Sequence, residues 1–268
     1  MQSRSQAWCF DVYRLPTRLM TAMFPVVSVV LLHMAPAFGA VASPVMPDAQ
    51  VMNSAAATLK AAPLNGIWFR TQGAENTFKD GIEMPPYNLE WTKKNNEIQK
   101  RRLAGQSIDD PSLRCIPFGM PRVMISATYP FEILVTPGQI TLIQELDSEV
   151  RRIFLNQEHP PVEELDSTYE GHSVGRWDGD TLVIDTIAIR SETPIDRLYY
   201  PRSEEMHVVE RWRLRDLNTL EVEITLHDQV ALVRPWSDIK TFARQSGEYI
   251  HEYICAENNE RVQPLVSE

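Results

Sequence analysis

The residues best suited to do chemistry lie in one short stretch, GHSVGRWDGDTLVIDT, which spans residues 171–186. Its Asp178-Gly179 pair stands between two segments of alternating polarity. This pattern predicts a β-hairpin with a two-residue type I′ turn. With the turn centred there, His172 on the first strand lies directly opposite Asp185 on the second.

A histidine facing an aspartate has a specific chemical meaning. A carboxylate that accepts a hydrogen bond from an imidazole fixes its tautomer and prepares the ring as a general base. Arg176 shares this face, so the cluster would also suit an acidic or hydroxylated ligand. No nucleophile completes a triad, because Ser173 lies on the opposite face. The alternative is therefore a cross-strand polar pair without catalytic work.

A second hairpin, MHVVERWRLRDLNTLEVEITLHD, places a carboxylate on an apolar face. Pairing Leu214 with Leu220 collects the apolar residues on one side and sets complementary charges opposite each other on the other side. A shift of one residue would destroy both agreements. In this register Glu210 lies opposite Ile224, and the facing charges are Arg213 with Glu221 and Arg211 with Glu223.

Burying a carboxylate on an apolar face costs roughly several kcal/mol of stability unless the group is paired or neutral. Glu210 is accordingly either half of a buried structural ion pair or a group tuned for acid–base work or ligand binding. The basic residues considered as its partner are Arg176, Arg152 and Arg234.

Metal ligation has weaker support in the sequence. The same register sets His207 opposite His227, with Asp228 and Glu205 nearby, a group able to hold a divalent ion. However, neither the H-E-x-x-H pattern nor paired-Cys spacing is present. We therefore predict a surface histidine pair, no metal and no cofactor. The chain also lacks a phosphate-cradling loop, which argues against a kinase or a dehydrogenase.

Aromatic residues are frequent in the second half of the chain, and they would either fill a core or line a pocket for a flat apolar molecule. The side chains expected to contact such a ligand are Arg176, Trp177, Trp212, Arg152 and Trp236.

The elements that must position these residues are mostly short strands. GIWFR (66–70) reads as a first strand, and 87–105 as the single convincing helix, ended by Gly105. Turn signals then recur every 8–12 residues, without alternating helices, which predicts an antiparallel up-and-down, lipocalin-like β-barrel with one N-terminal helix packed outside. The further strands are expected at 122–128, 131–136, 139–146, 149–155, 171–177, 180–189, 206–214, 220–228, 239–244 and 248–255.

The start of the chain has the pattern of a secretory signal peptide. Three arginines precede the apolar run LMTAMFPVVSVVLLHMA, and an A-x-A exit ends at Ala42. The alternatives are a single membrane anchor, for which the run is short, and a later start at Met20 or Met23. We expect a signal peptide over 1–42, a flexible lead-in over 43–62, one barrel domain over 63–260 and a tail over 261–268.

Charge and cysteine usage agree with an exported protein. The whole chain carries −10, and the leader contributes +2, so the remainder carries −12. An acidic surface without a basic stripe disfavours nucleic acid and anionic lipid as partners. Cys115 and Cys255 remain after cleavage, either joined as one disulfide or as two separately buried thiols.

Several motifs together resemble a large family of exported bacterial proteins of uncharacterised function. The resemblance covers residues 63–260 and implies export, but no activity. More weakly, Gly66-Ile67-Trp68 is similar to the first-strand G-x-W of lipocalin-type barrels. The family motifs, as they stand here, are RCIPFGMPR, YPFEIL, VRRIFL, GHSVGRWDGDTLVIDT, MHVVERWR, TLEVEITLHD, VRPW and CAENN.

Together these features predict a periplasmic or secreted β-barrel that binds a small, largely apolar molecule. The alternative is a cofactor-independent enzyme of lyase, hydratase or isomerase type on the same scaffold. In that case Glu210, or His172 with Asp185, would act as the base, and Arg176 would steady developing negative charge.

Overall fold

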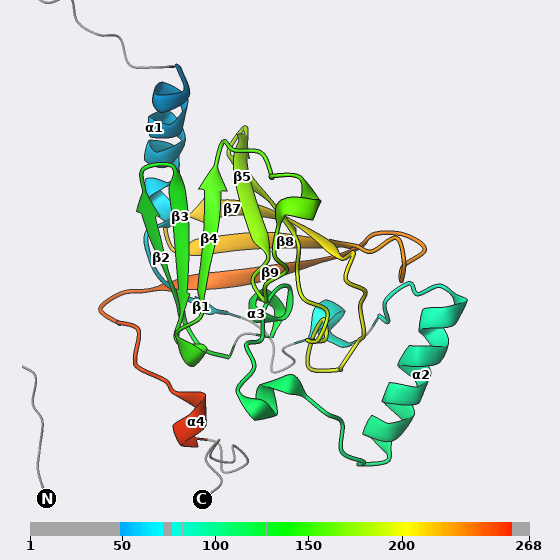
Figure 1. The fold of residues 1–268 in the computed structure, drawn as a ribbon. Coiled ribbons are helices and arrows are strands. Elements are labelled where there is room, and N and C mark those ends of the chain that lie inside the picture. Colours follow the sequence, from blue (N-terminus) through cyan, green and yellow to red (C-terminus); the bar gives the residue numbers. More distant parts are fainter. Residues whose placement is uncertain (1–48, 72–76, 82, 127, 259–268) are drawn as a thin grey trace, which may run out of the picture. The chain divides into compact units, whose positions relative to one another are not determined.

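Nine strands close into a single barrel in the computed structural model, which describes residues 49–71, 77–81, 83–126 and 128–258 (Figure 1). Each strand pairs with its sequence neighbours, and β1 pairs with β9 to close the ring. The strands are β1 (Gly66–Arg70), β2 (Phe131–Thr136), β3 (Gln139–Gln144), β4 (Val150–Leu155), β5 (His172–Asp178), β6 (Thr181–Ile187), β7 (His207–Asp216), β8 (Thr219–His227) and β9 (Trp236–Gln245).

The barrel departs from the predicted up-and-down topology at one pair. β4 and β5 run parallel, with Ile153 opposite Ser173 and Leu155 opposite Gly175. All the other pairs are antiparallel. A parallel pair requires the chain to return along the barrel before it pairs again. Residues 156–171, called the crossover below, make this return.

The β7–β8 register agrees with the sequence prediction. Leu214 pairs with Leu220, and Glu210 pairs with Ile224. The inward positions of both strands are buried, except for the partly buried Leu214, whereas the outward positions hold the facing charges. Hydrophobic patterning on two strands at once is therefore enough to set this register.

The lead-in, expected to be loose with at most a short helix, contains a 13-residue helix at one end of the barrel. The segment expected as a flexible lead-in forms α1 (Ala49–Ala61), with Ala57 and Ala61 buried against the core. Gly138 in the β2–β3 turn donates to Thr58 Oγ1 at 2.9 Å, and Trp177 donates through Nε1 to the Ala57 carbonyl at 3.3 Å. α1 thus packs on the turns at this end of the strands (Figure 1).

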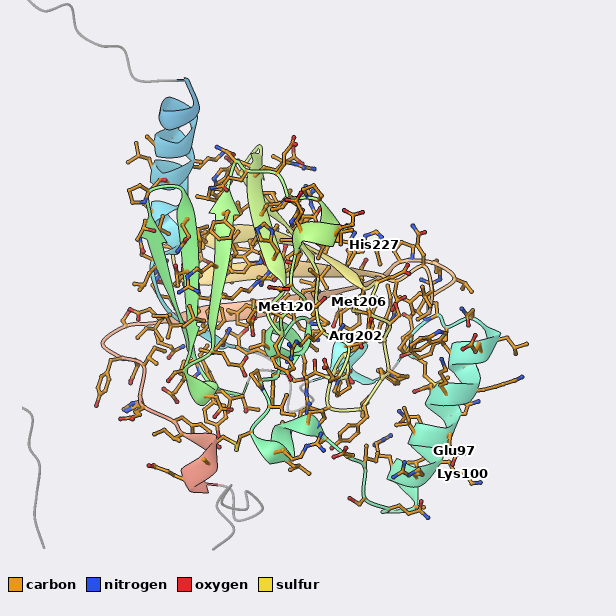
Figure 2. The ribbon with its side chains drawn as sticks, in the orientation of Figure 1. Glu97, Lys100, Met120, Arg202, Met206 and His227 are labelled. Carbon is orange, nitrogen blue, oxygen red and sulfur yellow. A yellow bond between two sulfur atoms is a disulfide. The ribbon has the colours of Figure 1, made fainter. Side chains whose placement is uncertain are left out.

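The opposite end of the barrel is covered by irregular segments rather than by a helix laid across the sheet. Figure 2 shows Met120, Met206 and Arg202 gathered there, and all three are buried. The predicted helix exists as α2 (Leu89–Leu103), capped by the Asn88 side chain. It docks through the Gln99 amide, which donates to the Leu198 carbonyl at 2.7 Å.

Two predicted strands are wrong. Residues 122–125 form the short helix α3 (Arg122–Ile125), which is entirely buried, and its apolar residues Val123, Met124 and Ile125 resemble a buried strand in sequence. Residues 248–254 have no strand pairing, and the chain then enters α4 (Cys255–Asn258). The predicted signal peptide, its cleavage point at Ala42 and the tail over 261–268 lie outside the described residues. In the described part of the chain, no helix has the length and apolarity to cross a bilayer.

Candidate functional site

The barrel interior contains a cluster of polar contacts around Glu210. Its carboxylate pairs with the Arg151 guanidinium, and both side chains are fully buried. Arg151 also donates to Thr186 Oγ1 at 2.9 Å and to Ser173 Oγ at 3.2 Å. Trp212 Nε1 donates to the second carboxylate oxygen at 3.2 Å. The predicted inward position of Glu210 is confirmed, and its place in a buried ion pair follows the structural alternative.

The partner of Glu210 was predicted wrongly. Arg152 was considered and Arg151 was not, because the hairpin before β4 offered no firm register. Leu142 pairs with Arg151, and this parity turns Arg151 inward and Arg152 outward. Neither Arg176 nor Arg234 contacts Glu210: Arg176 lies on an exposed outward position, and Arg234 pairs with Glu83.

The predicted ligand-contacting side chains do not converge on the barrel interior. Trp212 fills the interior next to Glu210, whereas Trp236 packs against Phe78 at the far end, with ring centroids 4.2 Å apart. Trp177 packs under α1 at the other end. Interior positions carry large side chains that are fully buried, among them Trp68, Phe131, Ile133, Ile140 and Phe242.

The β5–β6 hairpin turns one residue later than predicted. Asp178 pairs with Thr181, so the loop is Gly179-Asp180, and every cross-strand partner moves by two residues. His172 consequently pairs with Ile187, and Asp185 with Val174, which corrects the predicted His172–Asp185 pairing. Because a shift of two preserves the face, both side chains remain on the outer surface of the barrel.

His159, a residue of the crossover, lies between His172 and Asp185 and contacts both. His159 places Nδ1 at 2.8 Å from His172 Nδ1, and its Nε2 lies 3.6 Å from Asp185 Oδ1. The same Asp185 oxygen is hydrogen-bonded to His207 Nε2. His159 was not linked to the others from the sequence, because no strand register places a residue of a crossover.

The His207–His227 pairing is confirmed. The two residues are opposite each other in the β7–β8 register, and their rings stack with centroids 5.4 Å apart. Among the described residues, no three His, Cys, Asp or Glu side chains are arranged to hold a metal ion.

Burial and local charge set the protonation of this cluster. Burial lowers the pKa of His172, and the nearby His159 lowers it further. Burial also lowers the pKa of His159, although Asp185 opposes the effect. For Asp185, burial raises the pKa, but the His207 hydrogen bond and the two histidine charges outweigh it and bring the pKa below its usual value. At neutral pH, His172 and His159 are therefore neutral rings beside an ionised Asp185.

His172 also opens onto a groove on the outer surface. The groove encloses about 450 Å³ between β4, the end of the crossover and the loop before α3. The backbone beside the groove requires glycine at position 171. Gly171 has a φ of +66°, and a Cβ there would lie 2.6 Å from the Ile187 carbonyl oxygen. The residues that matter most for its chemistry are Pro117, Val150, Arg152, Phe154, Glu170 and His172. Of the predicted site residues, only Arg152 and His172 line it.

Two carboxyl groups, on Glu149 and Glu170, form part of the groove wall. Glu149 accepts a hydrogen bond from the Phe118 amide at 2.9 Å, and its carboxyl group also interacts with that of Glu170. Burial raises the pKa of Glu170 well above its usual value, and the charge of Glu149 raises it further. Burial likewise raises the pKa of Glu149. Glu170 therefore keeps its proton at pH values where an exposed glutamate is ionised.

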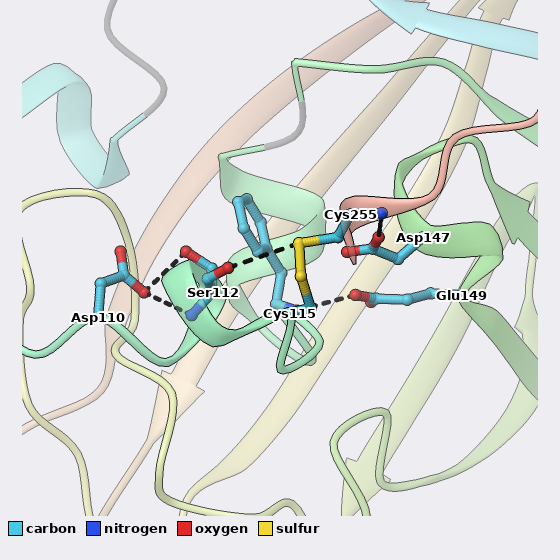
Figure 3. The surroundings of a disulfide bond; sticks show 7 residues. Asp110, Ser112, Cys115, Asp147, Glu149 and Cys255 are labelled. Atoms are coloured by element: carbon cyan, nitrogen blue, oxygen red, sulfur yellow. Dashed lines mark hydrogen bonds between the residues drawn. A yellow bond between two sulfur atoms is a disulfide. The ribbon is translucent and has the colours of Figure 1, made fainter. Parts of the chain in front are cut away.

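The disulfide between Cys115 and Cys255 borders this groove, with a Cα–Cα distance of 5.5 Å (Figure 3). It confirms the first of the two states predicted for these cysteines. Cys255 also donates its amide to Asp147 at 2.9 Å, which fixes the start of α4 beside the strands. The bond thereby ties the C-terminal segment to the loop that contributes Pro117.

Known proteins resemble this chain only distantly. No protein-family model and no curated protein sequence matches the chain, so the resemblance in its motifs stays a prediction. Among solved structures, the chain is similar to the "REP1-NXSQ fatty acid transporter" at 14% identity and a TM-score of 0.34, over 70% of this chain and 100% of that one. A point mutant of the same transporter matches at 12% identity and a TM-score of 0.31, over 69% of this chain and 100% of that one. Likenesses this distant carry no argument about function.

Proposed function

We propose that the protein binds a small, largely apolar molecule, and that it does so in the outer groove. The observation that carries this proposal is the groove itself, with apolar walls from Pro117, Val150 and Phe154 and convergent polar groups on Arg152 and His172. Ligand sites commonly combine an apolar surface with a few placed polar groups, in volumes of roughly 300–1,000 Å³.

The barrel interior suits a ligand less well. Its large side chains already pack against one another, and Glu210 already pairs with Arg151 and Trp212. A ligand entering there would have to displace buried side chains and break hydrogen bonds that have no replacement. The groove needs neither change.

A pair of matched variants tests the location. Val150 and Leu134 are outward-facing aliphatic side chains of similar exposure, 37% and 39%, but only Val150 lines the groove. The probe is the fluorescent naphthalene 1-anilinonaphthalene-8-sulfonate, titrated against each protein. Val150→Trp fills the groove and should weaken binding at least about tenfold, which corresponds to roughly 1.4 kcal/mol. Leu134→Trp should bind like the wild type.

Equal affinity for the wild type and Val150→Trp would contradict a site in the groove. Weakened binding in both tryptophan variants would point instead to a general effect on the fold. Circular dichroism of each variant separates these outcomes, since both substituted positions face outward and the barrel should be retained.

We also propose that the protein acts outside the cytoplasm, in the periplasm or as a secreted protein. The support is the leader pattern over 1–42 together with a disulfide, a bond that persists in oxidising compartments. Mass spectrometry of protein recovered from an exporting host should give a chain that starts at Ser43. An uncleaved chain retained in the cytoplasm would contradict this.

A further inference from the structure

We infer that the groove is also a catalytic site, in which His172 removes a proton from the bound molecule and His159, with Asp185, holds His172 in the required tautomer. This inference rests on the proposed function, because the substrate has to occupy the groove. It adds a reaction, a base and a positioning residue to the binding site.

The order of contacts determines where the protons lie. His159 Nε2 lies 3.6 Å from Asp185 Oδ1, which is too far for a hydrogen bond, but the negative charge of the carboxylate favours a proton on the ring nitrogen that faces it. The other ring nitrogen of His159 then carries a lone pair. Since it lies 2.8 Å from His172 Nδ1, the proton in that contact must come from His172. His172 is thus the Nδ1–H tautomer, with the lone pair on Nε2.

His172 Nε2 is therefore the atom able to accept a proton. Its ring lines the groove and is held in place by stacking on Phe154, with centroids 5.3 Å apart and an interplanar angle of 26°. Burial keeps the pKa of His172 below its usual value, so the ring is neutral, and hence basic, at neutral pH.

The same groove offers a group to stabilise the product of proton removal. Arg152 lines it, and its guanidinium suits a developing oxyanion. In the step we infer, a C–H bond next to a carbonyl breaks, and its proton moves to His172 Nε2. The electron pair of that bond passes to the carbonyl oxygen as an enolate facing Arg152. Return of a proton to carbon restores the carbonyl and the neutral histidine, so the step is balanced without a cofactor.

The substrate class that follows is a small, largely apolar carbonyl compound with an acidic C–H bond. The test uses the full chain and 1-phenylpropan-2-one as the probe, dissolved in deuterated water. Nuclear magnetic resonance follows the loss of the C–H signal beside the carbonyl. Wild-type protein should accelerate this exchange, and His172→Gln should lose roughly 100-fold or more of the acceleration.

His227→Gln is the matched control for this test. His227 lies on the same outer face and stacks on His207, but it does not line the groove. Its variant should exchange the probe at the wild-type rate. Full activity in His172→Gln, or equal losses in the two variants, would overturn the assignment of the base.

The positioning role of His159 has its own readout. Nitrogen-15 resonances of the imidazole rings report the tautomer directly. His172 should appear as Nδ1–H in the wild type and move to Nε2–H in His159→Phe, with kcat reduced and KM little changed. An unchanged His172 tautomer in His159→Phe would overturn this part of the inference. Dialysis against a chelator should leave exchange intact, and its loss on chelation would overturn a metal-free relay.

Binding and catalysis can fail separately. His172→Gln should retain the naphthalene probe, whereas Val150→Trp should lose both binding and exchange. A wild-type protein that binds in the groove but does not accelerate exchange would overturn the catalytic inference alone. Binding that is indifferent to Val150→Trp would overturn the proposed function as well.

Discussion

The barrel interior and the crossover side of its outer face hold polar groups of similar kinds, but they differ in how those groups are partnered. Inside, Glu210 and Arg151 are fully buried and pair with each other, and Arg151 also donates to the hydroxyls of Ser173 and Thr186. Outside, His172 and Arg152 lie on an open groove. A charge enclosed by its own protein has no capacity left for a ligand, whereas a half-exposed group retains it. Burial alone is therefore a poor guide to function in this fold.

The largest expected effect comes from breaking the interior pair. Glu210→Leu leaves the Arg151 guanidinium buried without its countercharge and should lower the free energy of unfolding by about 3–5 kcal/mol. The double variant Arg151→Met with Glu210→Leu removes both charges and should recover most of this loss. Urea unfolding measures both variants.

The Arg151–Glu210 pair should have no role in ligand binding. In the double variant, affinity for the naphthalene probe should equal that of the wild type, because the groove lies on the other side of the strands. A double variant as unstable as the single one, or one that no longer binds the probe, would show that the interior pair has a role beyond mutual compensation.

A smaller loss is expected from opening the disulfide beside the groove. Cys255→Ser frees the C-terminal segment from the loop that contributes Pro117. It should lower the free energy of unfolding by about 2–4 kcal/mol, since the bond closes a long loop in the unfolded chain. Thermal unfolding with and without a reductant measures this, and the reduced wild type should match the variant. A wild type insensitive to reduction would contradict it.

The smallest effect concerns the carboxyl groups at the groove wall and depends on pH. Native Glu170 keeps its proton above the usual glutamate pKa of 4.5, whereas the unfolded chain releases it. The native state then binds the extra proton, so the free energy of unfolding should fall as pH rises from 4.5, by at most about 1.4 kcal/mol per pH unit.

Glu170→Gln removes this dependence and should be more stable than the wild type at the upper end of the range. Urea unfolding between pH 5 and pH 8, in roughly one-unit steps, measures the slope. Glu163→Gln, a substitution at an exposed position of the same crossover, should keep the wild-type slope. Identical slopes in Glu170→Gln and the wild type would contradict a proton held in the groove wall.

Much of the barrel could be predicted from alternation along single strands. β1 and β2 have the predicted bounds, and β7–β8 has the predicted register. The β5–β6 turn was misplaced by one residue, because Asp178-Gly179-Asp180 offers two acceptable two-residue loops and Gly179 fits either. For this hairpin, alternation in the sequence predicts which face each side chain occupies, but it does not determine the register of the two strands.

The site was less predictable than the fold, for physical reasons. His172 and Asp185 were identified as a pair, but they meet through His159, which lies on the crossover. Contacts made by such a segment depend on its path over the barrel and leave no periodic signal in the sequence. Glu170 was missed for the same reason, since only its burial distinguishes it from the other carboxylates of that segment.

The parallel pair between β4 and β5 has a wider consequence for how this protein could change over time. A tight turn between antiparallel strands leaves little to vary, because the turn also sets the register of the pair. Here residues 156–171 join two strands whose antiparallel pairs on either side, β3–β4 and β5–β6, have registers set by residues outside the crossover. Apart from Gly171, side chains of this segment that line the groove can therefore change without altering those registers.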